Sequence, residues 1–128
     1  MTLLVRTDFA DSRAWQGLCE AVRTPSVEGF LAAVEFVDDP AFRDLAAEQV
    51  VERLPEGGYR RLVAVADATT LGSAEFPIVV IDVLRCPPRS LRVIASQLWS
   101  VENNLSLGNM DYEEFAGSVG ADGVFRGF

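Results

Sequence analysis

The sequence predicts a single-domain α/β protein, spanning residues 1–128, with a mixed sheet of about five strands and helices packed on it. Three observations predict this fold class. Short apolar runs of strand length alternate with segments whose apolar residues recur every three or four positions, as on one face of a helix. The length of 128 residues suits one domain, without internal repeats or linkers. Hydrophobic residues make up 49% and charged residues 23%, an ordinary globular composition.

The first half of the chain predicts the order β-α-β-α-β. A strand at residues 3–6 precedes a helix that begins at Asp11 or Ser12 and ends at Thr24-Pro25. A second strand is expected at residues 30–37. Asp39-Pro40 then begins a second helix, expected over 42–54, because Pro lacks the N–H that is unpaired at a helix start. A third strand follows at residues 61–66. Strands joined through helices pair in parallel, so these three strands should run in one direction.

The second half predicts a hairpin followed by two helices. Residues 76–84, nearly continuous in Ile and Val, indicate a fourth strand buried on both faces. A turn at residues 86–89 leads to a fifth strand at 91–95, which adds an antiparallel edge to the sheet. Ser96 is expected to cap the next helix. Asp111 and Glu114 have the spacing of a capping box for a short helix that Gly120 ends. The apolar tail at 124–128 should dock on the body.

The composition excludes several classes of function. The chain contains no His and no Lys, so all eleven basic residues are Arg. Without His there is no Ser–His or Cys–His pair and no His-ligated zinc. Without Lys there is no Schiff-base amine and no P-loop lysine. The net charge of −8 disfavours nucleic-acid binding and favours a basic protein as partner.

The sequence also predicts a cytoplasmic protein without membrane contact. The N-terminus reaches a charged residue at Arg6 and lacks the apolar region of a signal peptide. No apolar run approaches the roughly 20 residues that cross a bilayer. Cys19 and Cys86 lie far apart and belong to no C-x-x-C pattern, which favours two thiols in a reducing cytosol over a disulfide.

Four aspartates form the first candidate site. They follow the first three predicted strands, whose carboxyl ends would share one edge of a parallel sheet: Asp8, Asp38, Asp39 and Asp67. Ligands bind at that edge in open α/β sheets, and converging carboxylates suit Mg²⁺. A metal-bound water could then support hydrolysis or phosphoryl transfer. The alternative is that each aspartate caps a helix or turn of its own, which needs no convergence.

A polar segment near the C-terminus forms the second candidate site, for a polar ligand or peptide. Its amides, carboxylates and indole come from Trp99, Glu102, Asn103, Asn104, Asn109 and Asp111. The alternative is structural, with Asn104 and Asn109 at turn positions and Trp99 anchored in the core.

Arginines near the predicted strand ends are a third feature. They could pair with carboxylates or bind an anionic ligand, and the alternative is a solvated surface that balances charge: Arg60, Arg61, Arg85, Arg89 and Arg92.

Several stretches of the chain resemble a family of small bacterial proteins of unknown function. They read Val-Arg-Thr-Asp-Phe at 5–9, Trp-Ser-Val-Glu-Asn-Asn-Leu-Ser at 99–106 and Asn-Met-Asp-Tyr-Glu-Glu-Phe-Ala at 109–116. The closing stretch at 121–128 is similar as well, so the likeness covers essentially the whole chain. The resemblance implies one intact domain and carries no activity, cofactor or catalytic residue.

The sequence therefore favours a small acidic protein-interaction module, immunity-like or regulatory and without a cofactor. The functional prediction depends on what is missing, namely a nucleophile–base pair, a cofactor fingerprint and a zinc pattern. A Mg²⁺-dependent hydrolase or phosphotransferase that uses the strand-end aspartates is the alternative, so the sequence leaves catalysis open.

Overall fold

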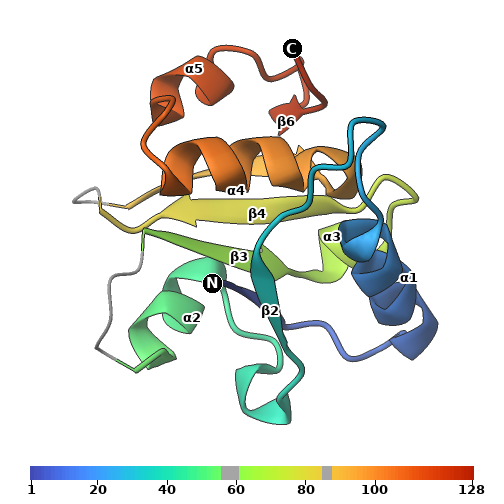
Figure 1. The fold of residues 1–128 in the computed structure, drawn as a ribbon. Coiled ribbons are helices and arrows are strands. Elements are labelled where there is room, and N and C mark those ends of the chain that lie inside the picture. Colours follow the sequence, from blue (N-terminus) through green and yellow to red (C-terminus); the bar gives the residue numbers. More distant parts are fainter. Residues whose placement is uncertain (56–60, 85–87) are drawn as a thin grey trace.

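One mixed sheet of six strands forms the centre of the computed structural model, which describes residues 1–55, 61–84 and 88–128 (Figure 1). The spatial order of the strands is β2-β1-β3-β4-β5-β6. This arrangement confirms the predicted mixed α/β class. The strands are β1 (Thr2–Arg6), β2 (Val34–Val37), β3 (Leu62–Ala66), β4 (Pro77–Asp82), β5 (Arg89–Ile94) and β6 (Val124–Phe125).

The parallel pairing of the first three strands is confirmed. β1 lies between β2 and β3 and pairs with both in parallel. β4 runs antiparallel to both β3 and β5. The prediction of an antiparallel hairpin at the sheet edge is wrong in one respect, because β6 pairs in parallel with β5 and becomes the edge strand itself. The described residues therefore form six strands where the sequence predicts about five.

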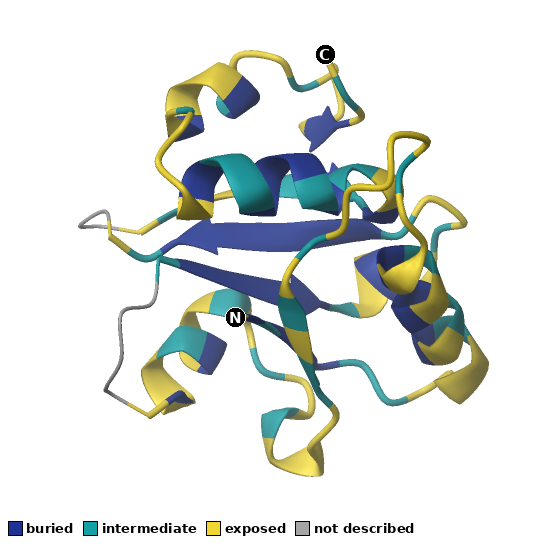
Figure 2. Cartoon of the chain, in the orientation of Figure 1, coloured by how far each residue is buried: buried dark blue, intermediate teal, exposed yellow. Residues whose placement is uncertain are grey.

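Helices pack on both faces of this sheet. They are α1 (Ser12–Arg23), α2 (Ala47–Arg53), α3 (Ala68–Leu71), α4 (Leu98–Ser106) and α5 (Tyr112–Ala116), with the 3₁₀ turns η1 (Pro40–Phe42) and η2 (Ala95–Gln97). Side chains of α1, α4 and α5 form one core cluster with one face of the sheet, whereas α2 packs in a second cluster on the opposite face. Figure 2 shows β3 and β4 buried between these layers, as β4 is predicted to be.

The first helix forms as predicted. The Asp11 side chain caps it by accepting hydrogen bonds from the N–H groups of Arg13 and Ala14, at 3.0 and 3.1 Å. Its apolar stripe is buried, and the helix ends at Arg23, with Thr24 as its C-cap before Pro25.

The prediction of one helix over 42–54 is wrong, because a tertiary contact interrupts it. Asp39 does cap a helical start, accepting from the Ala41 N–H at 2.9 Å, but only the short turn η1 follows. Asp44 then has a φ of 59° and donates its N–H to the Thr7 carbonyl at 2.8 Å. Helix α2 starts only after this bend. The chain thereby ties the loop after β1 to the loop after β2.

Two predicted helix boundaries near the C-terminus are also wrong. Ser96 caps no helix, because β5 continues directly into η2 and then α4, whose start has no side-chain cap. Helix α5 ends at Ala116, before Gly120. The Gly120 N–H instead bonds to the Val124 carbonyl at 3.0 Å, which turns the chain into β6. The tail docks as expected, since Phe125 is fully buried.

The second strand is shorter than predicted, because a loop replaces its first part. Phe30 donates its N–H to the Ser26 hydroxyl at 3.0 Å, and its carbonyl accepts from the Ser26 N–H at 2.9 Å. These bonds fold residues 26–30 back on themselves, so that β2 begins only at Val34.

The cysteine and membrane predictions are tested in part. Cys19 is a free thiol on α1, and its burial raises the pKa of the thiol. Cys86 and the first half of its predicted turn lie outside the described residues. Among the helices of the described ranges, none is long and apolar enough to cross a bilayer.

Candidate functional site

The strand-end aspartates lie along one edge of the sheet, since β1, β2 and β3 are parallel. Two of them fulfil local roles in turns. Asp8 accepts a hydrogen bond from the Ala10 N–H at 3.1 Å, and Asp39 accepts from the Ala41 N–H at 2.9 Å. Both interactions fit the capping alternative.

A buried arginine occupies the edge where a cation is predicted. Arg6, at the end of β1, is 4% exposed, and its Nη1 lies 3.3 Å from the Asp38 carboxylate. Its Nε donates to the Asp8 carbonyl at 2.9 Å, and the guanidinium lies 4.4 Å from the centre of the Phe9 ring. The guanidinium thus supplies positive charge to this edge from within the chain.

Asp67 is paired with a different arginine. Nη1 and Nη2 of Arg92 approach its two carboxylate oxygens at 3.0 and 2.7 Å, and the Thr70 N–H donates to Oδ1 at 3.0 Å, which caps α3. Partial burial raises the pKa of Asp67, whereas the hydrogen bonds from Arg92 and Thr70 lower it. Together these bonds outweigh the effect of burial, so the pKa lies below its ordinary value. Asp67 is therefore a stable anion within an ion pair that joins β5 to the start of α3.

Each of the four carboxylates thus has a partner of its own, and none of these partners is shared. In the described ranges, no three His, Cys, Asp or Glu side chains come together closely enough to hold a metal ion. A Mg²⁺ centre for hydrolysis would need such a group. The geometry thus supports capping and ion pairing at this edge.

The second candidate segment divides into two parts. Trp99, Glu102 and Asn103 all lie on α4 and line two pockets. Asn104 instead donates its side-chain amide to the Ser100 carbonyl at 2.8 Å within the same helix. Its own carbonyl accepts from the N–H of Asn109 at 2.9 Å, which holds the loop after α4.

Asp111 belongs to the same loop structure. Its N–H donates to the Glu114 carboxylate at 2.8 Å, the reciprocal half of the predicted capping box. Asn109 and Asp111 are exposed and line none of the pockets described here. The residues of the segment that could bind a ligand are therefore those on α4.

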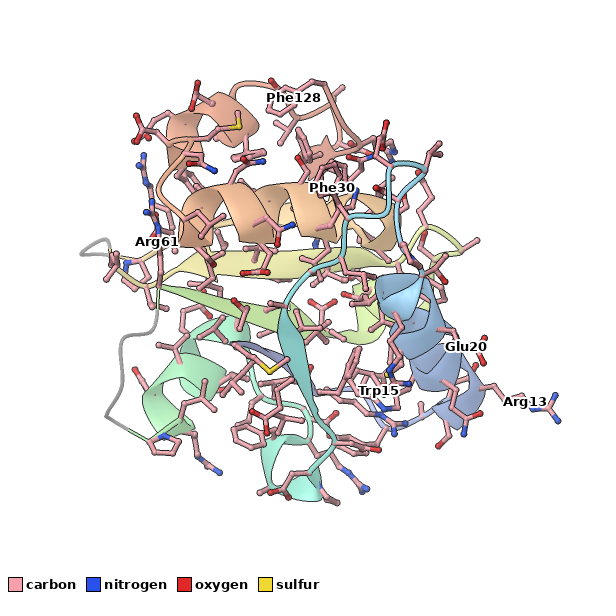
Figure 3. All side chains as sticks on the ribbon, in the orientation of Figure 1. Arg13, Trp15, Glu20, Phe30, Arg61 and Phe128 are labelled. Carbon is pink, nitrogen blue, oxygen red and sulfur yellow. The ribbon has the colours of Figure 1, made fainter. Side chains whose placement is uncertain are left out.

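Trp99 stacks on the exposed aromatic ring of Phe30, a residue that the sequence analysis predicts to lie in a strand. Phe30, 50% exposed, stacks on Trp99 with ring centres 5.1 Å apart and planes 12° from parallel. Phe30 comes from the loop before β2 and lies over α4 (Figure 3). Val27 and Leu31 in the same loop are exposed as well. We call Val27, Phe30, Leu31 and Trp99 the apolar loop face.

The arginines differ in their partners. Arg89 pairs with Glu113 and lies 4.7 Å from the centre of the Tyr112 ring, and Arg92 pairs with Asp67. Arg61 makes no side-chain hydrogen bond or ion pair to another described residue, and its buried Nε lacks a partner there. Arg60 and Arg85 fall outside the described residues.

The profile of a family described as a domain of unknown function, DUF6924, matches residues 1–128. The chain belongs to this family. Among the curated proteins, none matches it. DUF6924 membership agrees with the resemblance to a family of unknown function and assigns no role to any residue.

Proposed function

We propose that this DUF6924 protein is a non-enzymatic protein-interaction module of the immunity or regulatory kind. It acts in the bacterial cytoplasm and binds a basic protein through the apolar loop face. The competing Mg²⁺-dependent activity would need the strand-end carboxylates at one ion, whereas Asp38 and Asp67 are engaged by arginines and Asp39 by a backbone N–H. The geometry therefore favours the interaction role.

The observation that carries the proposal is the exposed stack of Phe30 on Trp99. Phe30 is exposed together with Val27 and Leu31 and stacks on the half-buried Trp99. Apolar side chains exposed together are typical of interaction surfaces, because monomeric proteins rarely expose large contiguous apolar patches. A hollow between this loop and η2 is also lined by Pro25, Val27, Phe30 and Trp99. An apolar side chain of a partner would be desolvated there, as at the centre of many interfaces.

The charges of the loop that carries Val27, Phe30 and Leu31 support a basic partner. Residues 24–35 contain Glu28 and Glu35 and no basic residue, and both glutamates are exposed. The whole chain carries a net charge of −8. A basic partner would thus be attracted over a distance of about one Debye length before the apolar contacts form.

The experiment compares partner binding by matched surface variants. Proteins captured by the wild-type chain from cells of its source are identified by mass spectrometry, and the affinity of each purified candidate is then measured. Phe30→Ser with Leu31→Ser removes apolar area from the loop face, while Leu84→Ser removes an exposed apolar side chain away from the loop. Glu28→Gln with Glu35→Gln removes the flanking charge.

We expect a basic partner whose binding is weakened at least about tenfold by the Phe30/Leu31 variant and little by Leu84→Ser. The glutamine variant should lower the association rate more than it raises the dissociation rate, with the largest effect at low salt. Equal affinity for the wild type and the Phe30/Leu31 variant, or only acidic partners, would overturn it.

A further inference from the structure

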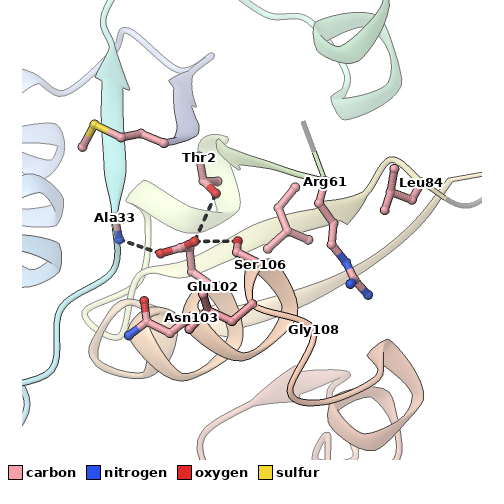
Figure 4. Close-up of a pocket in the computed structure, with 11 residues that line it drawn as sticks. Thr2, Ala33, Arg61, Leu84, Glu102, Asn103, Ser106 and Gly108 are labelled. Atoms are coloured by element: carbon pink, nitrogen blue, oxygen red, sulfur yellow. Dashed lines mark hydrogen bonds between the residues drawn. The ribbon is translucent and has the colours of Figure 1, made fainter. Parts of the chain in front are cut away.

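A second hollow, separate from the apolar loop face, lies between α4, the start of β1 and the start of β3. Its volume is about 500 Å³, within the range of small-molecule sites. Figure 4 shows Glu102 and Asn103 of α4 on one side and Arg61 with Leu84 on the other. The pocket therefore combines one acidic and one basic side chain with apolar walls.

Glu102 is buried, with 4% of its surface exposed. Its carboxylate has no cationic partner in the described ranges. Its oxygens accept hydrogen bonds from the Ala33 N–H at 2.6 Å, the Ser106 hydroxyl at 2.7 Å and the Thr2 hydroxyl at 3.4 Å. All three donors are neutral. A carboxylate offers about four acceptor positions, so one position is left. Buried charges are normally paired with an opposite charge, and among the described residues no cationic side chain forms an ion pair with Glu102.

Arg61 gives the pocket its positive end. Its Nε is buried without a partner among the described residues, and its guanidinium makes no ion pair with Glu102. In Figure 4 the guanidinium extends away from the Glu102 carboxylate. A planar guanidinium with unused N–H groups is well suited to bind a carboxylate.

We propose that this pocket binds a small zwitterion of the amino-acid class, either a free amino acid or a dipeptide. Its ammonium group would meet Glu102 and its carboxylate would meet Arg61. Its apolar side chain would lie against Leu62, Leu84 and Leu107, of which the last two are exposed at the pocket.

The two charges discriminate between classes of ligand. A simple anion would satisfy Arg61 but would be repelled by Glu102, and a simple cation would meet the reverse situation. Only a ligand with both charges compensates both the buried Glu102 carboxylate and the half-buried Arg61 guanidinium. The exposed leucines add a preference for an apolar over a polar side chain.

Calorimetry and thermal shift with defined probes test the proposal. The probes are L-leucine and L-leucyl-L-leucine, with glycine lacking the apolar side chain, N-acetyl-L-leucine lacking the cation and L-leucinamide lacking the anion. Arg61→Gln removes the positive end, and Glu102→Gln keeps the shape of the acidic end. Arg13→Gln, at an exposed position of α1, is the matched control. The Arg61 Nε–H signal in NMR reports a change in the surroundings of the guanidinium on binding.

Binding of leucine or the dipeptide, at least about tenfold tighter than of any probe lacking a charge, supports the proposal. Arg61→Gln should weaken this binding at least about tenfold, whereas Arg13→Gln should leave it unchanged. The Arg61 Nε–H signal should shift on titration. No binding of either zwitterion at millimolar concentration, or binding that Arg61→Gln does not weaken, would overturn it. If Glu102→Gln fails to fold, the Arg61 variant and the probe series still decide the question.

Discussion

Replacing Asp67 by Ala removes both the cap of α3 and the ion pair with Arg92. An N-cap bond such as that from Thr70 contributes about 1 kcal/mol. The two guanidinium bonds are charge-assisted, but Arg92 and Asp67 are 28% and 32% exposed, so solvent limits their joint contribution to about 1–2 kcal/mol. The expected loss in the free energy of unfolding near neutral pH is therefore about 2–3 kcal/mol, equivalent to a fall of about 10 °C in midpoint.

The ion-pair part of this loss should depend on pH. Because the pKa of Asp67 is lowered in the folded state, it lies below the unfolded value of about 3.9. A carboxyl of this kind stabilises the fold above its unfolded pKa, and the stabilisation disappears as pH falls through the folded-state pKa. The difference between wild type and Asp67→Ala should thus be full at neutral pH and shrink below about pH 4.

Urea unfolding at a series of pH values measures this difference. Asp67→Asn keeps an acceptor for the cap but removes the charge, so its loss should be smaller than that of Asp67→Ala. Asp39→Ala is the control, because Asp39 is exposed and caps a single N–H, and it should cost about 1 kcal/mol or less. A loss below about 0.5 kcal/mol for Asp67→Ala, or one that is equal at pH 3 and pH 7, would refute the reasoning.

Four further measurements test other parts of the structure. Phe115→Ala, at a fully buried ring in contact with Phe125, should cost about 3–5 kcal/mol in urea unfolding, and a loss below about 1 kcal/mol would contradict the packing. Glu102→Ala removes the acceptor of the Ala33 N–H, so amide hydrogen exchange at residues 30–33 should accelerate, and unchanged exchange would count against that anchor. The peptide containing Cys19 should be alkylated far more slowly in native than in urea-unfolded protein, because the thiol is buried and its pKa is raised; equal rates would contradict this. Millimolar Mg²⁺ should shift the unfolding midpoint no more than Na⁺ does at equal ionic strength. A larger shift that Asp67→Asn abolishes would instead support the Mg²⁺ site.

Elements with strong local signals are predictable from the sequence. α1 has a capping aspartate, a regular apolar stripe and a proline after its end, and these signals act within the helix itself. β6 has only two residues and exists because it pairs with β5, which no local pattern encodes. The break before α2 likewise depends on the contact between Asp44 and the Thr7 carbonyl, made by residues far apart in sequence.

The candidate site is predictable only as far as the topology. Parallel strands bring the aspartates to one edge, but their partners depend on tertiary contacts, such as that of Arg6 with Asp38 and that of Arg92 with Asp67. Phe30 and Leu31 continue an apolar run into β2, so their composition predicts a strand. The bonds between Ser26 and Phe30 that bend this loop follow no periodic pattern, so the apolar loop face emerges only from the structure.

β1 precedes the other described strands along the chain, yet it lies inside the sheet between β2 and β3. Its pairing with β3 joins residues about sixty positions apart, such as Leu3 and Val63, whereas β3, β4 and β5 pair as neighbours along the chain. Because the entropy lost in closing a loop grows with its length, the antiparallel three-strand unit should fold before β1 inserts. Until then the free edge of β3 is open to strands of other chains, so slow refolding at high protein concentration should favour aggregation through this edge.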